Sequence, residues 1–191
     1  ASATTGSASP INSILTPHFA GDWSDNQTLF VSGADSTTFG TVVNRLDLNQ
    51  SASTTVIDPA GGFSGGVAIT GDTLYAGEGD TGSVYAFDLA TLATATNSVA
   101  INSGSFTTAH ESAGSIDTDP FGNLIVAGGV FDFGSGTFSG SAAVIDPLTQ
   151  DKLILTPAGS DAFYGSYFND ATNQLIVTAN GTAYVYAIPA P

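Results

Sequence analysis

A unit that recurs four times along the chain is the feature that most constrains its fold. Each copy reads Gly-x-x, a short variable stretch, a turn, and then a leucine followed by apolar residues and a Gly or Ala. The anchoring leucines are spaced 45, 50 and 51 residues apart, at Leu29, Leu74, Leu124 and Leu175. The copies are GDWSDNQTLFVSG from Gly21, GGVAITGDTLYAG from Gly65, GSIDTDPFGNLIVAG from Gly114 and GSYFNDATNQLIVTA from Gly165.

Each repeat predicts four short strands. One further apolar run follows each core after a polar loop, and another run precedes it. Gly, Asn and Asp stand between the first two strands of the copies, where a hairpin turn is needed. No segment shows helical periodicity over three turns. The runs after the cores begin at Thr41, Ser83, Ser141 and Thr182, and those before the cores begin at Ile11, Ser53, Asn97 and Lys152.

Four-stranded units at this spacing are typical of propeller blades. The four copies resemble the broad family of secreted bacterial propellers with NHL-like or YVTN-like blades, in which a Gly opens the innermost strand and a GNL-type turn follows. The resemblance covers residues 11–188. It implies the fold and is almost silent on function, because such families include enzymes, binders and scaffolds.

We therefore predict an all-β, four-bladed β-propeller-like domain of four-stranded antiparallel sheets over residues 11–188, with repeat cores starting near 19, 63, 112 and 163. Residues 1–10 are expected to form a flexible N-terminal segment, and 189–191 a C-terminal tail. The last repeat has only three predicted strands, so residues 11–17 are expected to supply its outer strand and close the ring. Alternatively, the same edges pair between molecules and form a larger ring or a fibre.

Composition excludes several classes of function. The chain has 191 residues, 17 acidic and two basic ones, and a formal net charge of −15. Such a surface repels nucleic-acid phosphates and anionic lipid. The absence of cysteine excludes a disulfide scaffold, a thiol nucleophile and a zinc-thiolate site. No apolar run approaches the roughly 20 residues of a membrane helix, so we expect no insertion of this chain into a membrane.

Both histidines and both glutamates are expected on one face of the propeller, where loops converge at the mouth of the channel. One hypothesis is therefore a divalent-cation or carbohydrate site, since imidazole and carboxylate groups suit a divalent transition metal. The alternative is that these are solvated loop residues. The candidates are His18, His110, Glu111, Glu78, Asp80 and Asp161.

Calcium is a second candidate ligand. The segment DTDPFGN places Asp117, Asp119 and Asn123 in an oxygen-rich loop of the kind that a hard cation needs. The same segment is also explained as a hairpin turn within the third blade.

The third repeat carries a longer connection, residues 128–140, which is rich in apolar residues. Phe131 and Phe133 stand two apart, so an extended hairpin puts both rings on one side. With Phe138 they form either a flap over the neighbouring blade or a contact for another subunit or ligand.

The two ends of the sequence favour export. The chain begins ASATTGSAS without Met, as a mature protein does after removal of a secretory signal. Pro189-Ala190-Pro191 resembles the junction before the sorting tail of exosortase-processed (PEP-CTERM-type) bacterial surface proteins.

Function is predicted as structural or adhesive, at a cell surface or in an extracellular matrix, with self-association or binding of extracellular polysaccharide. The alternative is a propeller module that binds a cation or glycan. No nucleophile elbow or phosphate-binding loop is credible, so the chain is not expected to be an enzyme. A lyase or hydrolase would require His18, His110 and Glu111 to converge within hydrogen-bond reach.

Overall fold

The computed structural model describes residues 18–25, 27–49, 53–58, 64–79, 82–99, 106–107, 113–132, 134–155, 163–179 and 182–188. These residues form four antiparallel sheets that follow one another in chain order, which confirms the predicted all-β class. We call the sheets blades 1 to 4. Blade 1 consists of β1 (His18–Trp23), β2 (Thr28–Ala34), β3 (Thr41–Asp47) and β4 (Ser53–Ile57), and blade 2 of β5 (Ser64–Thr70), β6 (Thr73–Glu78), β7 (Ser83–Asp88) and β8 (Phe106–Thr107). Blade 3 consists of β9 (Ser115–Thr118), β10 (Leu124–Asp132), β11 (Thr137–Ile145) and β12 (Lys152–Leu155), and blade 4 of β13 (Phe163–Asn169), β14 (Gln174–Ala179) and β15 (Thr182–Ala187).

The first hairpin of each blade turns where the repeat predicts it. Gly71, Gly122 and Asn173 have φ angles of 55°, 88° and 53°. This left-handed conformation is open to glycine and, among other residues, is adopted most readily by Asn and Asp. Beyond the turns, Leu74, Leu124 and Leu175 are fully buried, whereas Leu29 is only partly buried. The repeated leucine therefore marks the core in blades 2 to 4.

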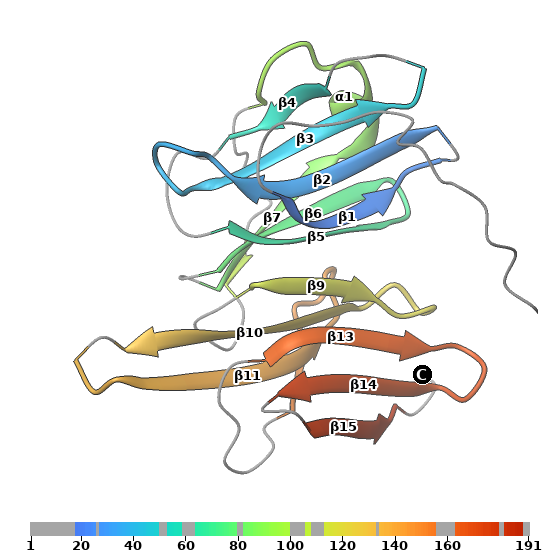
Figure 1. The fold of residues 1–191 in the computed structure, drawn as a ribbon. Helices are drawn as coiled ribbons and strands as arrows, with labels where there is room; N and C mark the ends of the chain where they lie inside the picture. Colours follow the sequence, from blue (N-terminus) through green and yellow to red (C-terminus); the bar gives the residue numbers. More distant parts are fainter. Residues whose placement is uncertain are drawn as a thin grey trace, which may run out of the picture.

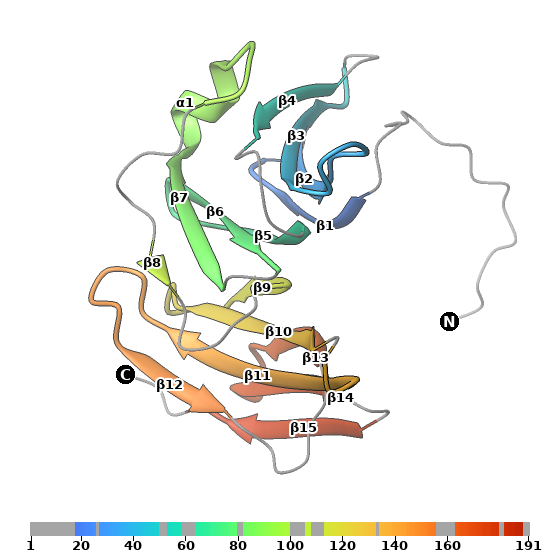
Figure 2. The same ribbon diagram turned by 90° about the vertical axis from the view of Figure 1, so that its left-hand side faces the viewer.

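The blades are arranged around a common axis, with β1, β5, β9 and β13 nearest to it (Figure 2). In Figure 1 the same axis runs across the page, with blades 1 and 2 above it and blades 3 and 4 below. Extensive contacts join β1 to β5, β5 to β9, and β9 to β13. Blades 1 and 4 are therefore the two ends of an arc.

Three apolar clusters hold the arc together, one at each junction between consecutive blades. Phe30 and Val43 of blade 1 pack with Leu74 and Phe87 of blade 2. Tyr75 and Val84 of blade 2 belong to the second cluster, with Leu124, Val126 and Ile145 of blade 3. The third cluster joins Ile125 and Val144 of blade 3 to Phe168, Leu175 and Val177 of blade 4.

The predicted closure of the ring is not found among the described residues. Blade 4 has three strands, and no ladder of hydrogen bonds joins it to blade 1. Residues 11–17, the expected closing strand, lie outside the described residues.

The short length of chain before β1 gives a physical reason why this closure is not found. The strand β5 begins at Ser64 after β4 ends at Ile57, and β13 begins at Phe163 after β12 ends at Leu155. If the closing outer strand ended at Leu15, only the three residues up to His18 would connect it to β1, and they reach about 11 Å at full extension. Crossing a four-stranded blade takes three strand spacings, about 14 Å.

Blade 2 differs from its prediction in the fourth strand, which the sequence places from Asn97. A six-residue helix, α1 (Leu89–Thr94), follows β7 directly, and the fourth strand is instead β8. Asp88 caps α1 by accepting hydrogen bonds from the Thr91 amide and hydroxyl at 2.7 and 2.6 Å. The helix turns the chain away from β7, and the Val99 amide donates to the Val56 carbonyl of blade 1.

Candidate interaction surfaces

Each blade presents one row of side chains toward the next blade, which we call its forward row. Residues paired directly across antiparallel strands point to the same face of a sheet. The forward rows are Asp22–Phe30–Arg45, Ala68–Tyr75–Ala86, Asp117–Ile125–Val144 and Tyr167–Ile176–Val185 in blades 1 to 4.

The next blade buries the middle of each of the first three forward rows. Phe30 and Ile125 are 0% exposed, and Tyr75 is 6% exposed. All three lie in the clusters that join consecutive blades. The forward row is therefore the surface by which one blade packs on another.

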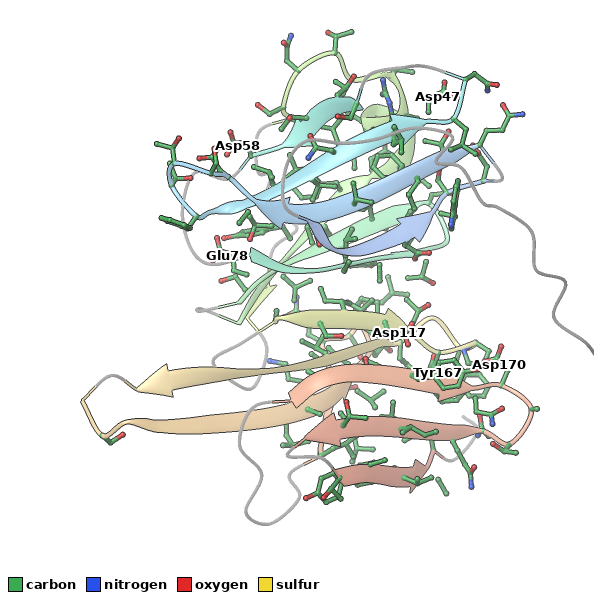
Figure 3. The ribbon with its side chains drawn as sticks, viewed as in Figure 1. Asp47, Asp58, Glu78, Asp117, Tyr167 and Asp170 are labelled. Carbon is green, nitrogen blue, oxygen red and sulfur yellow. The ribbon has the colours of Figure 1, made fainter. Side chains whose placement is uncertain are left out.

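The forward row of blade 4 is uncovered. Tyr167 is 61% exposed and Val185 is 57% exposed, with Ile176 partly buried between them. Figure 3 shows Tyr167 on β13, near Asp170. An apolar row left open across a whole sheet is the kind of surface that marks an interaction site.

Two aspartates tie neighbouring blades together through the backbone. In blade 1, Asp22 accepts a hydrogen bond from the Trp23 amide at 2.8 Å and another from the Ile69 amide of blade 2 at 2.7 Å. Asp117 holds the same position in blade 3, where it accepts from the Thr118 amide at 2.8 Å and from the Phe168 amide of blade 4.

Burial raises the pKa of Asp117 above its usual value, and the negative charges of Asp22 and Asp170 raise it further. Figure 3 shows Asp117 at the same end of the sheets as Asp170. Blades 2 and 4 carry Ala68 and Tyr167 at the position of these aspartates. Blade 4 thus lacks the carboxylate and exposes a phenol ring instead.

The predicted His/Glu face is described only in part. Glu78 ends β6 with its side chain 7% exposed, and its carbonyl accepts from the Ala113 amide at 2.9 Å. His18 is the first residue of β1, opposite Gly33, and its side chain lies outside the description. The other four candidates lie outside the described residues: Asp80, His110, Glu111 and Asp161.

The cation or glycan site on this face therefore stays a prediction. In the part of the chain that the structure covers, no three His, Cys, Asp or Glu side chains are grouped as a metal site would need. Glu78 lies at the opposite end of the sheets from Asp117 and Asp170 (Figure 3).

The segment considered for calcium forms the turn between β9 and β10. Asp119 is 6% exposed, and one of its carboxylate oxygens accepts from the amides of Phe121 and Asn123, both at 2.9 Å. The second oxygen accepts from the Asn123 side-chain amide at 2.8 Å. These bonds account for the acidic residue as a turn former; calcium binding stays a prediction.

The aromatic connection of the third blade lies on a long hairpin. The strands β10 and β11 have nine residues each and project beyond the other blades (Figure 1). The register places Phe131 opposite Phe138. Phe133 and the side chains of Phe131 and Phe138 lie outside the description, so the choice between flap and contact stays a prediction.

The sequence analysis missed Tyr167, Val185 and the paired roles of Asp22 and Asp117. Aligning the inner strands on their pairing with the repeated leucine would have shown a Tyr where two other copies have Asp. That comparison marks blade 4 as different. It does not by itself show that the forward row is exposed.

Comparisons with known proteins support the fold. No family model and no curated protein matches the sequence. Among solved structures, the chain is similar to one in a nidogen/laminin complex, at 16% identity and a TM-score of 0.66, over 90% of this chain and 61% of that one.

Two bacterial structures are also similar to this chain. The first is the extracellular domain of a protein described as a one-component system from B. thetaiotaomicron, at 15% identity and a TM-score of 0.56, over 88% of this chain and 20% of that one. The second is a gluconolactonase from Xanthomonas campestris, at 17% identity and a TM-score of 0.56, over 85% of this chain and 54% of that one.

These likenesses define the class: the fold is that of β-propeller proteins. In each of the three, this chain spans less than two thirds of the structure it matches. One of the neighbours is an extracellular domain. Among the described residues, no helix has the length and apolar composition needed to cross a membrane.

One prediction is corrected by this comparison. The sequence motifs led us to expect that the chain is not an enzyme, but a gluconolactonase has the same fold. A propeller of this kind is compatible with catalysis as well as with binding, so the missing nucleophile elbow does not decide the matter.

Proposed function

We propose that this chain is an extracellular structural or adhesive module that associates with copies of itself at a cell surface or in a matrix. The observation that carries the proposal is the uncovered forward row of blade 4, Tyr167–Ile176–Val185. The corresponding rows bind one blade to the next everywhere else in the arc.

Charge supports an apolar contact as the basis of association. With 17 acidic and two basic residues, two copies repel each other over most of their surfaces. The forward row of blade 4 contains no charged residue. Its burial against another copy contributes about 25 cal/mol per Å² of apolar surface removed from water.

Sedimentation velocity over a wide range of protein concentration tests the proposal, with Tyr167→Asp as the test variant. We expect the wild type to associate and the dissociation constant of the variant to rise by about tenfold or more, because losing a central aromatic contact costs at least about 1.4 kcal/mol.

Leu148→Asp is the matched control. Leu148 is 90% exposed in the turn between β11 and β12 of blade 3, so it is not part of the forward row of blade 4. The control adds the same charge at another exposed apolar position and should associate as the wild type does. A wild type that remains monomeric at every concentration overturns the proposed function.

A further inference from the structure

The outer edge of blade 4 differs from that of the other blades. In blades 1, 2 and 3, the third strand is paired on its outer side with β4, β8 or β12. Among the described strands, none pairs with the outer side of β15. An unpaired strand edge is a template for another strand.

The sequence contains one segment that matches this edge. Residues 14–17 read Ile-Leu-Thr-Pro, and residues 154–157 read the same. In the second case Ile154 and Leu155 belong to β12, the outer strand of blade 3. The N-terminal segment therefore has the sequence of an outer strand.

The register of blade 3 shows how the segment would pair. The strand β12 sets Leu155 opposite Ala142 and Leu153 opposite Val144. Counted from the repeated leucine of each blade, Ala142 corresponds to Ala183, and Val144 to Val185. The same register sets Leu15 opposite Ala183 and Ser13 opposite Val185.

The chain cannot donate this strand to its own fourth blade in that register. Leu15 is three positions before His18, where β1 begins. Three extended residues reach about 11 Å, whereas crossing a blade from its outer to its inner strand takes about 14 Å. The same segment of a second copy is not restricted in this way, because it connects to the first blade of its own chain and need not reach the first blade of the chain that it joins.

We propose that residues 11–17 of a second copy add to β15 as the fourth strand of blade 4. This inference rests on the proposed self-association and names its partner segment. Neither residues 11–17 nor β15 carries a charge. The added strand thus joins two uncharged segments of strongly acidic chains and completes the blade with the sequence used in blade 3.

Disulfide trapping tests the pairing, since the wild type has no cysteine. Chains with Ser13→Cys are mixed with chains carrying Val185→Cys and exposed to oxidised glutathione. Directly opposed residues on neighbouring strands have Cβ atoms about 4.5–5.5 Å apart, which small shifts bring within disulfide reach. We expect a disulfide-linked heterodimer, identified by mass spectrometry of the linked peptides.

Two controls locate the contact. Leu148→Cys in place of Val185→Cys should give no more cross-linking than unpaired collisions do. The double variant Ser13→Cys/Val185→Cys separates the two closures: links between chains support exchange, whereas a disulfide confined within each monomer shows closure by the chain's own segment and overturns the inference.

A variant of the segment itself provides an independent measurement. Leu15→Pro removes a backbone amide that this register directs at β15, because the corresponding residue, Leu155, belongs to a hydrogen-bonded pair of the antiparallel ladder. Leu15 also lies outside all four repeat cores. We expect weaker association with an unchanged circular dichroism spectrum.

The two proposals fail in different ways. If the wild type is monomeric, the proposed function is overturned and the inference with it. If the wild type associates but no Ser13–Val185 link forms and Leu15→Pro associates normally, only the strand exchange is overturned.

Discussion

At the scale of single residues, the aspartates show how one residue type takes different roles. Asp88 and Asp146 stand at strand ends, and hydrogen bonds from Thr91 and from the Leu148 and Thr149 amides lower the pKa of each carboxyl. Asp117 lies between blades, and its pKa is raised because burial disfavours its charge. The two environments correspond to two positions in the repeat, the end of a third strand for Asp88 and Asp146 and an inner strand for Asp117.

The raised pKa of Asp117 predicts a pH dependence of stability. Above the folded-state pKa, the ionised form opposes folding; as the pH falls toward the ordinary value of 3.8, the folded state binds the proton first and gains stability. We expect the free energy of unfolding of the wild type, relative to Asp117→Asn, to rise between neutral pH and pH 4.

Urea unfolding of both proteins at several pH values measures this difference. The variant removes the titrating group while keeping the size of the side chain. A difference that is constant with pH, or that falls on acidification, contradicts the assignment.

At the scale of elements, glycines set how closely the inner strands approach. A Cβ on Gly66 of β5 would lie 2.3 Å from the amide nitrogen of Ile116 in β9. Gly66 and Gly165 each stand three residues before the residue opposite the repeated leucine, so they hold corresponding positions in β5 and β13. A Cβ on Gly165 would meet only Thr178 Oγ1, at 3.7 Å. The same repeat position is crowded in blade 2 and open in blade 4.

This contrast predicts opposite outcomes for the same substitution. We expect Gly66→Ala to destabilise the fold by about 1–3 kcal/mol or more, because the backbone of β9 must move. Gly165→Ala should be neutral or slightly stabilising, since alanine loses less entropy on folding. Thermal unfolding of both variants measures the two changes in stability. An equal loss of stability in both variants would show that blade 4 is as crowded as blade 2.

At the scale of the whole molecule, the net charge of −15 acts on every blade and on every approaching copy. Salt shortens the range of this repulsion from about 30 Å at 0.01 M to about 8 Å at 0.15 M ionic strength. The same repulsion between negative charges therefore lowers both the stability of the fold and the association of its copies.

We expect the melting temperature and the extent of association to rise together between low and physiological sodium chloride. Calorimetry and sedimentation measure the two effects. Calcium chloride at matched ionic strength serves as the control: a larger rise with calcium indicates specific binding, whereas an equal rise counts against the predicted calcium site. A fall of stability with added salt contradicts the repulsion argument.

The features of this protein that depend on local chemistry can be predicted from its amino-acid sequence. The leucine period, the turn residues such as Gly71 and Asn173, and the apolar runs specify four antiparallel sheets, because turns and alternation act over a few residues. The sequence analysis missed α1, whose six residues are too few to show a helical period.

Which surfaces of the blades are covered depends on how the blades pack in three dimensions. Ile125 and Ile176 hold the same place in their blades, yet the first is fully buried beneath blade 4 and the second belongs to an open row. The burial of Asp117 likewise depends on the tertiary structure. Each depends on whether another blade lies against it, a contact between residues far apart in the chain that no local pattern encodes.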